Sequence, residues 1–254
     1  MNRHRPLQRP SPRKEMHMAL YSLADFVVDL DHQHDYLAQQ CAQYRYEGTD
    51  PAEITVCVSQ EQIKRERDLF PNTRYSDGYL ESICAYRQLC LKLPVRDAML
   101  MHGSVIECQS RGIAFLAPSG VGKTTHTMLW KQVYPDQVRI INGDKPIIRF
   151  FGEAPYAYGT PWAGKEHMQI NDRVQLTDLC LIRRGEKNAV YRIDPAEHLD
   201  LLMQQLLLPA EPEAAEKTLE LLDRLLSTCS LWVIQCNVSE EAAITARNAI
   251  IGEI

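Results

Sequence analysis

Residues 115–130, FLAPSGVGKTTHTMLW, restrict the fold more than any other stretch of the chain. An apolar strand pattern leads into a glycine turn, and a helical pattern begins directly behind that turn. The successive backbone N–H groups of such a turn, together with the N-terminus of the following helix, form a concave site for an anion. Gly120, Gly122, Lys123 and Thr124 stand in the order that a phosphate-binding loop requires. The stretch therefore predicts an α/β domain with a site for nucleotide phosphates.

The loop departs from the full pattern at its first position, where Ala117 replaces glycine. Alanine is compatible with the start of the turn if its φ angle is negative. The other interpretation is an ordinary glycine turn that binds nothing. If the loop binds nucleotide, the residues involved are Ser119, Gly120, Val121, Gly122, Lys123, Thr124 and Thr125. We expect the Thr124 hydroxyl on magnesium, Thr125 as a first-turn helix residue, and His126 in a packing or surface role.

A second acidic element is expected on a neighbouring strand, where it would hold or orient the magnesium. The stretch VRIINGDKPIIRF, residues 138–150, has an apolar strand pattern, a break, and Asp144 directly behind the break. Asp144 is therefore the predicted metal ligand. The alternative is that NGDK forms a simple hairpin turn, because Asn-Gly is a strong hairpin signal.

Composition excludes several classes of protein. The chain has 254 residues, 45% of them hydrophobic, which suffices for one core or for one core with a small attached subdomain. We find no run of about 18 apolar residues and expect no membrane span. The net charge is −5, and it becomes −10 without the five basic residues of segment 1–14. An acidic body is a poor match for nucleic acid or for an anionic membrane surface.

The eight cysteines show no C-x-x-C spacing, and no His pair follows at zinc-finger spacing. Buried thiols in a reducing compartment are the expected state, which predicts a cytoplasmic protein. Residues 1–17 are basic and have no apolar core, so they are not a secretory signal. We expect a disordered tail or a start codon placed too early, with Met16 or Met18 as the true start; a functional basic arm is the alternative.

The pattern along the chain predicts a small α+β region over 18–96 and a phosphate-loop domain over 97–254. Ser59 and Gln62 form a capping-box signature for a helix over 59–70. The other predicted helices are 34–45, 79–93, 194–208, 213–227 and 239–251. The predicted strands are 19–31 (one or two strands), 52–59, 97–108, 112–118, 138–142, 145–151 and 231–238.

Four segments together resemble a known family. They are HGSVI (102–106), GIAFLAPSGVGKTTHT (112–127), INGDKPIIR (141–149) and YGTPWAGKE (158–166). They resemble the C-terminal kinase domain of HPr kinase/phosphorylase, and more closely the bacterial proteins known only as HPr-kinase-like. The superfamily also contains ATP-dependent phosphoenolpyruvate carboxykinase. The resemblance covers about residues 97–254 and implies a phosphoenolpyruvate carboxykinase-like phosphate-loop domain with a mixed twisted sheet.

The resemblance also implies roles for individual residues. Lys123 and the loop amides would bind the phosphates of ATP, Thr124 and Asp144 would hold Mg²⁺, and His102 would lie beside the reacting phosphate. Residues 159–166 would form an active-site loop. In that loop, Lys165 either meets phosphate or the acceptor or is simply solvated, and Trp162 is a packed lid residue.

One residue departs from the family. The family usually has two adjacent aspartates after the strand, the first a general base and the second a metal ligand, and Gly143 stands at the first position. Glycine cannot take a proton. Either another group such as His102 does this work, or the activity is reduced, altered or lost.

The predicted function is ATP- and Mg²⁺-dependent phosphorylation of a hydroxyl, on a protein or peptide serine or on a small molecule. The alternative is a weak or inactive nucleotide-binding protein that serves as sensor or partner of a peptide-modifying system. Carboxykinase-like chemistry with Lys165 and His167 ranks below both, because the chain is short for it. The acceptor, the reversibility of transfer and the formation of a homo-oligomer, as in the hexameric HPr kinases, stay open.

Overall fold

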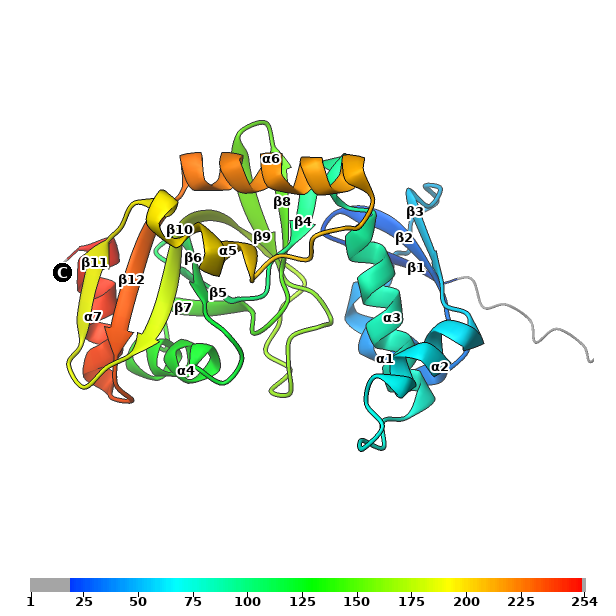
Figure 1. Ribbon diagram of the computed structural model, residues 1–254, viewed down its shortest axis with the longest axis horizontal. Helices are drawn as coiled ribbons and strands as arrows, with labels where there is room; N and C mark the ends of the chain where they lie inside the picture. The colour runs from blue at the N-terminus through cyan, green and yellow to red at the C-terminus, as the bar shows by residue number, and fades with distance from the viewer. Residues whose placement is uncertain (1–18, 253–254) are drawn as a thin grey trace, which may run out of the picture.

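The computed structural model describes residues 19–252 and has a mixed α/β architecture (Figure 1). The expectations for residues 1–17 lie outside the described residues. Two sheets are present in the described part of the chain, one with three strands and one with nine. No helix within residues 19–252 combines the length and apolar character that crossing a membrane requires.

The first sheet and three helices form the N-terminal part, at the right of Figure 1. Strand β1 pairs antiparallel with β2 through a turn at Ala24 and Asp25, and β2 pairs parallel with β3. The predicted capping box of Ser59 and Gln62 is confirmed at the start of α2. The element bounds are β1 (Leu20–Leu23), β2 (Phe26–Asp31), α1 (Asp35–Gln40), β3 (Ile54–Cys57), α2 (Gln60–Asp68) and α3 (Asp77–Leu91).

The large sheet has the order β4-β8-β9-β10-β6-β5-β7, and β12 and β11 continue from β10 on a second branch. The first residues of β10 pair with β9, and its remainder lies parallel between β6 and β12. Residues 154–192, for which the sequence pattern predicts no element, thus contain the strand that joins both branches. The bounds are β4 (Ala98–Leu100), β5 (Ser104–Cys108), β6 (Arg111–Leu116), β7 (Val138–Asn142), β8 (Ile147–Phe151), β9 (Ala154–Tyr158), β10 (Arg173–Arg184), β11 (Ala189–Arg192) and β12 (Ser230–Cys236).

Helices cover both faces of the large sheet. Along β6, Ile113 and Phe115 pack toward α4 (Lys123–Val133) and α7 (Glu240–Ile251). The alternate residues of β6 pack with the opposite core, which includes α5 (Leu199–Met203) and α6 (Pro212–Thr228). This alternation is what a strand buried on both faces produces. The N-terminal part shares a core with the large sheet, since Ile147, Tyr158 and Trp162 belong to its hydrophobic cluster. The division predicted at residue 97 stays a prediction.

The helix predicted over 194–208 is wrong in extent. Asp194 caps it as predicted, but the segment is a 3₁₀ turn (Pro195–His198) followed by the short α5. The helix ends because the next residues pair with another segment. Leu206 forms a β-bridge with Met101, and the carbonyl of Gln205 accepts the N–H of His102 at 2.7 Å. Tertiary pairing therefore overrides the local helical pattern and joins this segment to Met101 and His102, shortly before β5.

The sheet order determines where the predicted site residues meet. β6, β10 and β12 run parallel, and β7 runs in the same direction because β5 is antiparallel to both β6 and β7. The phosphate loop follows β6, Asp144 follows β7, and His102 precedes β5, so all three lie at one edge of the sheet. The carboxyl ends of parallel strands are the usual place for ligands in such sheets.

Candidate functional site

The phosphate loop, residues 117–122, connects β6 to α4 directly. Gly120 and Gly122 have φ angles of +79° and +134°, and a Cβ atom at either position would meet nothing within 4 Å. Glycine is therefore needed for the backbone conformation and not for space. Ala117 is not among the described residues with positive φ, so it meets the condition under which alanine can begin the turn.

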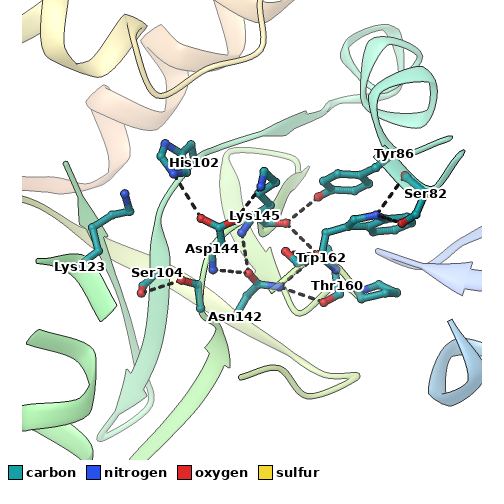
Figure 2. Close-up of polar contacts among 12 residues, drawn as sticks. Ser82, Tyr86, His102, Ser104, Lys123, Asn142, Asp144, Lys145, Thr160 and Trp162 are labelled. Atoms are coloured by element: carbon teal, nitrogen blue, oxygen red, sulfur yellow. Dashed lines mark hydrogen bonds and ion pairs between the residues drawn. The ribbon is translucent and has the colours of Figure 1, made fainter. Parts of the chain in front are cut away.

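Lys123 is the first residue of α4 and is buried, with 7% of its surface exposed. Its Nζ donates to the carbonyl of Ala117 at 2.8 Å, so the ammonium lies over the start of the loop. Burial lowers the pKa of Lys123, while the Asp144 carboxylate acts in the opposite direction. Asp144, which follows strand β7, therefore lies close enough to Lys123 for its negative charge to raise the pKa of the lysine (Figure 2).

The remaining loop residues differ in accessibility. Ser119, Gly120 and Thr125 are exposed, whereas Val121, Gly122 and Thr124 are half-buried. The side chain of Arg184, at the end of β10, contacts the loop. Its Nη2 donates to the Gly120 carbonyl at 2.5 Å and its Nε to the Val121 carbonyl at 3.1 Å. The sequence analysis missed Arg184, and no local motif marks it, because only the parallel pairing of β10 with β6 brings it there.

A cavity of about 380 Å³ lies beside the loop, between the start of α4 and the ends of β10 and β12. Its size is in the range of small-molecule sites. Its walls include Val121, Leu129, Ile182, Arg184, Asn237 and Val238. His126 lines its buried side and accepts the indole N–H of Trp130 at 3.0 Å. Burial lowers the pKa of His126 to about 4, so the ring is neutral and packs as expected.

The acidic turn, residues 142–145, follows β7. The Asn142 Oδ1 accepts the backbone N–H groups of Asp144 and Lys145, at 2.9 and 2.8 Å. The alternative that NGDK joins a hairpin is wrong, because β7 pairs with β5 whereas β8 pairs with β4 and β9. The turn instead carries the chain from β7, at one end of the order β4-β8-β9-β10-β6-β5-β7, to β8, near its other end.

Both oxygens of the Asp144 carboxylate have partners (Figure 2). His102 Nε2 lies 3.3 Å from Oδ1, and Lys145 Nζ lies 2.7 Å from Oδ2. Burial raises the pKa of Asp144, but the hydrogen bond from His102 and the charge of Lys145 outweigh that effect, and the pKa falls to about 2. The carboxylate is therefore ionised at neutral pH and lies between two basic side chains.

Gly143 packs directly against the 159–168 segment. A Cβ atom there would lie 2.9 Å from the carbonyl oxygen of Ala163 and 3.3 Å from the Cε of Met168. The first of these neighbours is backbone, which cannot move aside as a flexible side chain can. The 163–168 segment therefore occupies the space that a side chain at position 143 would need.

Residues 159–166 lie against the acidic turn, and their role as an active-site loop stays a prediction. Trp162 is buried and donates its indole N–H to Ser82 Oγ at 2.9 Å. Lys165 and His167 are exposed. Thr160 Oγ1 accepts a hydrogen bond from the side-chain amide of Asn142 and donates one to the Lys145 carbonyl at 2.8 Å. The sequence analysis missed the roles of Asn142 and Lys145, although an Asn two residues before the turn amides is a recognisable Asx-turn signal.

The residues present fit a magnesium nucleotide and not a metal held by protein alone. No group of three or more His, Cys, Asp or Glu that could hold a metal ion occurs within residues 19–252. Mg²⁺ commonly takes one or two protein oxygens and completes its shell with water and phosphate oxygens. Thr124, at the second position of α4, and the ionised Asp144 supply two such oxygens at the phosphate-binding edge.

Comparisons with known proteins add a distant likeness of fold. No protein-family model matches the chain, and no curated protein sequence does. Among solved structures, the HPr(Ser) kinase/phosphatase from Coxiella burnetii matches over 60% of this chain and 97% of its own. The sequence identity is 8% and the TM-score is 0.34. The family named from the motifs stays a prediction.

Proposed function

We propose that the protein is an ATP- and Mg²⁺-dependent kinase that phosphorylates a hydroxyl, on a protein or peptide serine or on a small molecule. One observation carries the proposal. An anion-binding loop with a buried lysine and an ionised, histidine-paired aspartate meet at one edge of the sheet. Phosphoryl transfer requires these groups, because its catalysis consists mainly of positioning and neutralisation of charge.

Lys123 and the loop amides would hold the phosphates, and the cavity next to the loop would accept the nucleoside. Thr124 and Asp144 would hold Mg²⁺, which supplies neutralisation of the phosphate charge when it is bound. Lys145 now occupies Oδ2 of Asp144 at 2.7 Å. When Asp144 holds the cation, the Lys145 ammonium would turn from this oxygen toward a phosphate.

His102 takes the role of general base in this proposal. Its Nε2 faces Asp144, so the carboxylate orients the ring and leaves Nδ1 to take the proton of the acceptor hydroxyl. The hydroxyl oxygen forms the new bond to the γ-phosphorus, the bond to the β-phosphate oxygen breaks, and ADP leaves. Asp144 stabilises the charge that develops on the imidazole.

The second candidate is a nucleotide-binding protein that transfers nothing. The observation that favours it is the close approach of Ala163 to Gly143, which leaves no room for the family's base. This candidate keeps the roles of the phosphate loop and cavity and removes that of His102.

Thermal unfolding with and without Mg²⁺ and ATP tests nucleotide binding. Ligand at a hundred times its dissociation constant stabilises the folded chain by about 2.7 kcal/mol, which raises Tm by about 5 to 10 °C for a chain of this size. Lys123→Ala should abolish the rise. Lys131→Ala, on the same helix but away from the loop, is the matched control and should retain it. No rise for the wild type would contradict both candidates.

Transfer of label from γ-labelled ATP to a serine-containing peptide library, with ADP release measured in parallel, separates the two candidates. The kinase predicts turnover that His102→Gln lowers at least about a hundredfold, the range of general acid–base contributions. Nucleotide binding without label transfer or ADP release would support the second candidate.

A further inference from the structure

The backbone carbonyl of Lys145 accepts two side-chain hydrogen bonds from different parts of the molecule. Tyr86 OH, on α3 of the N-terminal part, donates at 2.6 Å, and Thr160 Oγ1 donates at 2.8 Å (Figure 2). A carbonyl oxygen has two lone pairs, so its acceptor capacity is filled. Helix α3, which lies outside the large sheet, therefore helps to set the direction of this carbonyl.

Tyr86 is itself held rigidly. Its ring stacks on Trp162, with centroids 4.0 Å apart and planes inclined by 12°. Trp162 is tied back to the same helix through Ser82, and Gln40 of α1 donates to the Pro161 carbonyl at 3.0 Å. Only 4% of Tyr86 is exposed. The packed ring directs its hydroxyl at the acidic turn, where it donates to the Lys145 carbonyl.

The other anchors of the turn are also backbone contacts. Asn142 accepts the two amides of the turn, and the Asp144 carbonyl accepts the N–H of Gly103 at 2.9 Å. The Asp144 carboxylate, in contrast, is held by His102 and Lys145, whose contacts the proposed reaction rearranges. While those contacts change, the backbone anchors alone keep the carboxylate in place beside the phosphate loop.

We propose that Tyr86 is a positioning residue: its hydroxyl holds the Lys145 carbonyl and thereby sets the position of the Asp144 carboxylate for a nucleotide-bound cation. The N-terminal part thus supplies a structural component of the site and is more than an attached subdomain. This inference rests on the proposed function, since it assigns Asp144 to the cation.

The test uses the full chain with Tyr86→Phe, which keeps the stacked ring and removes the hydroxyl. Tyr44→Phe is the matched control. Tyr44 is also buried in the N-terminal part, and its hydroxyl also donates to a carbonyl beyond that part, Ile170 at 3.3 Å, but not to the acidic turn. Two quantities are measured for both variants and the wild type: hydrogen exchange in residues 142–146 without ligand, and the factor by which Mg²⁺ tightens ATP binding.

We expect Tyr86→Phe to speed exchange in residues 142–146 and to lower the Mg²⁺ tightening factor about tenfold, the lower end of the effect of removing an outer partner of a metal ligand. ATP binding without Mg²⁺ should be unchanged, because the phosphate loop is untouched. Tyr44→Phe should leave both quantities at wild-type values, even where it lowers Tm.

Unchanged exchange, or faster exchange with an unchanged Mg²⁺ factor, would overturn the positioning role and leave Tyr86 as a packing residue. A wild type that binds no ATP, or whose ATP binding Mg²⁺ does not tighten, would overturn the proposed function, and the positioning role with it. The two failures are distinguishable because the second is seen in the wild type.

Discussion

The two halves of the candidate site are built in different ways. The phosphate loop consists of contiguous residues, 117–122, and its glycine conformations and following helix account for most of its shape, with Arg184 as a distant hydrogen-bond donor. The acidic turn has four residues, but its anchors come from Tyr86, Gly103 and Thr160. A loop made by its own sequence tolerates changes elsewhere, whereas a turn made by distant partners depends on the whole fold. The acidic turn is therefore where the function of this protein is most easily lost.

The largest effect is expected from Asn142→Ala. The Asn142 side chain is fully buried and has hydrogen bonds to Asp144, Lys145 and Thr160. Its removal leaves buried donors and acceptors without partners and should cost about 3 kcal/mol of unfolding free energy. Chemical denaturation measures this loss.

Asn171→Ala is the control for that change, since Asn171 is exposed and its side-chain amide donates to the Gln43 carbonyl at 3.0 Å. It should alter the free energy of unfolding by about 0.5 kcal/mol or less. Equal losses for the two variants would break the comparison, because the acidic turn would then hold its shape without its central side chain.

Gly143→Asp should destabilise the chain by about 2 kcal/mol, the range for overpacking, and should not increase label transfer from γ-labelled ATP. The reason is the carbonyl of Ala163, 2.9 Å from the new Cβ. Gly152→Asp is the control: φ there is +58°, which Asp tolerates better than most residues, and a Cβ meets nothing within 4 Å. A stable, more active Gly143→Asp variant would show instead that the 159–168 segment moves aside for a base.

Asp144→Asn should remove most of the Mg²⁺ dependence of ATP binding, about tenfold in affinity, and leave ATP binding without Mg²⁺ intact.

The contribution of Asp144 to the free energy of unfolding depends on pH with a definite sign. Because the pKa of Asp144 is lowered from 3.8 to about 2, its charged contacts stabilise the folded chain above pH 4 and are lost as pH falls toward 2. Wild type and variant should therefore differ in unfolding free energy at pH 6 and converge near pH 2. A constant difference would contradict the ion pairs.

His126 gives the phosphate-loop side its own pH window. Its pKa is lowered by burial from 6.5 to about 4, so the unfolded chain takes up the proton first as pH falls. This group should reduce stability between pH 6.5 and 4, with a slope that approaches about 1.4 kcal/mol per pH unit. His126→Gln keeps an acceptor for Trp130 and should remove that slope.

His167→Gln, at an exposed histidine outside the loop, is the control variant measured alongside His126→Gln. Denaturation measured across pH should thus show two separate windows in which the free energy of unfolding falls, one above pH 4 because of His126 and one below pH 4 because of Asp144. If the free energy of unfolding fell in a single pH window, one titrating group would account for the loss at both the loop and the turn.

Much of the fold follows from local pattern. The strand before the loop, the capping box at Ser59 and the long helix α3 all appear where alternation, capping chemistry and helical spacing predict them. Two instructive exceptions are β10, which no local signal separated from its surroundings, and the helix over 194–208, which ends where Gln205 and Leu206 join the segment around His102. In both, a pairing partner far along the chain decides the conformation.

The sequence by itself determined the glycine turn between β6 and α4, because a glycine turn, a lysine and a helix start are contiguous and their geometry depends on local φ angles. The family resemblance also led us to expect His102 and Asp144 around the same phosphate. Only the tertiary structure decided that they lie 3.3 Å apart, that Lys145 occupies the second carboxylate oxygen, and that Gly143 has no room for a side chain. The physical reason is that these relations depend on which strands pair and how loops pack, and neither is encoded in any one stretch of the chain.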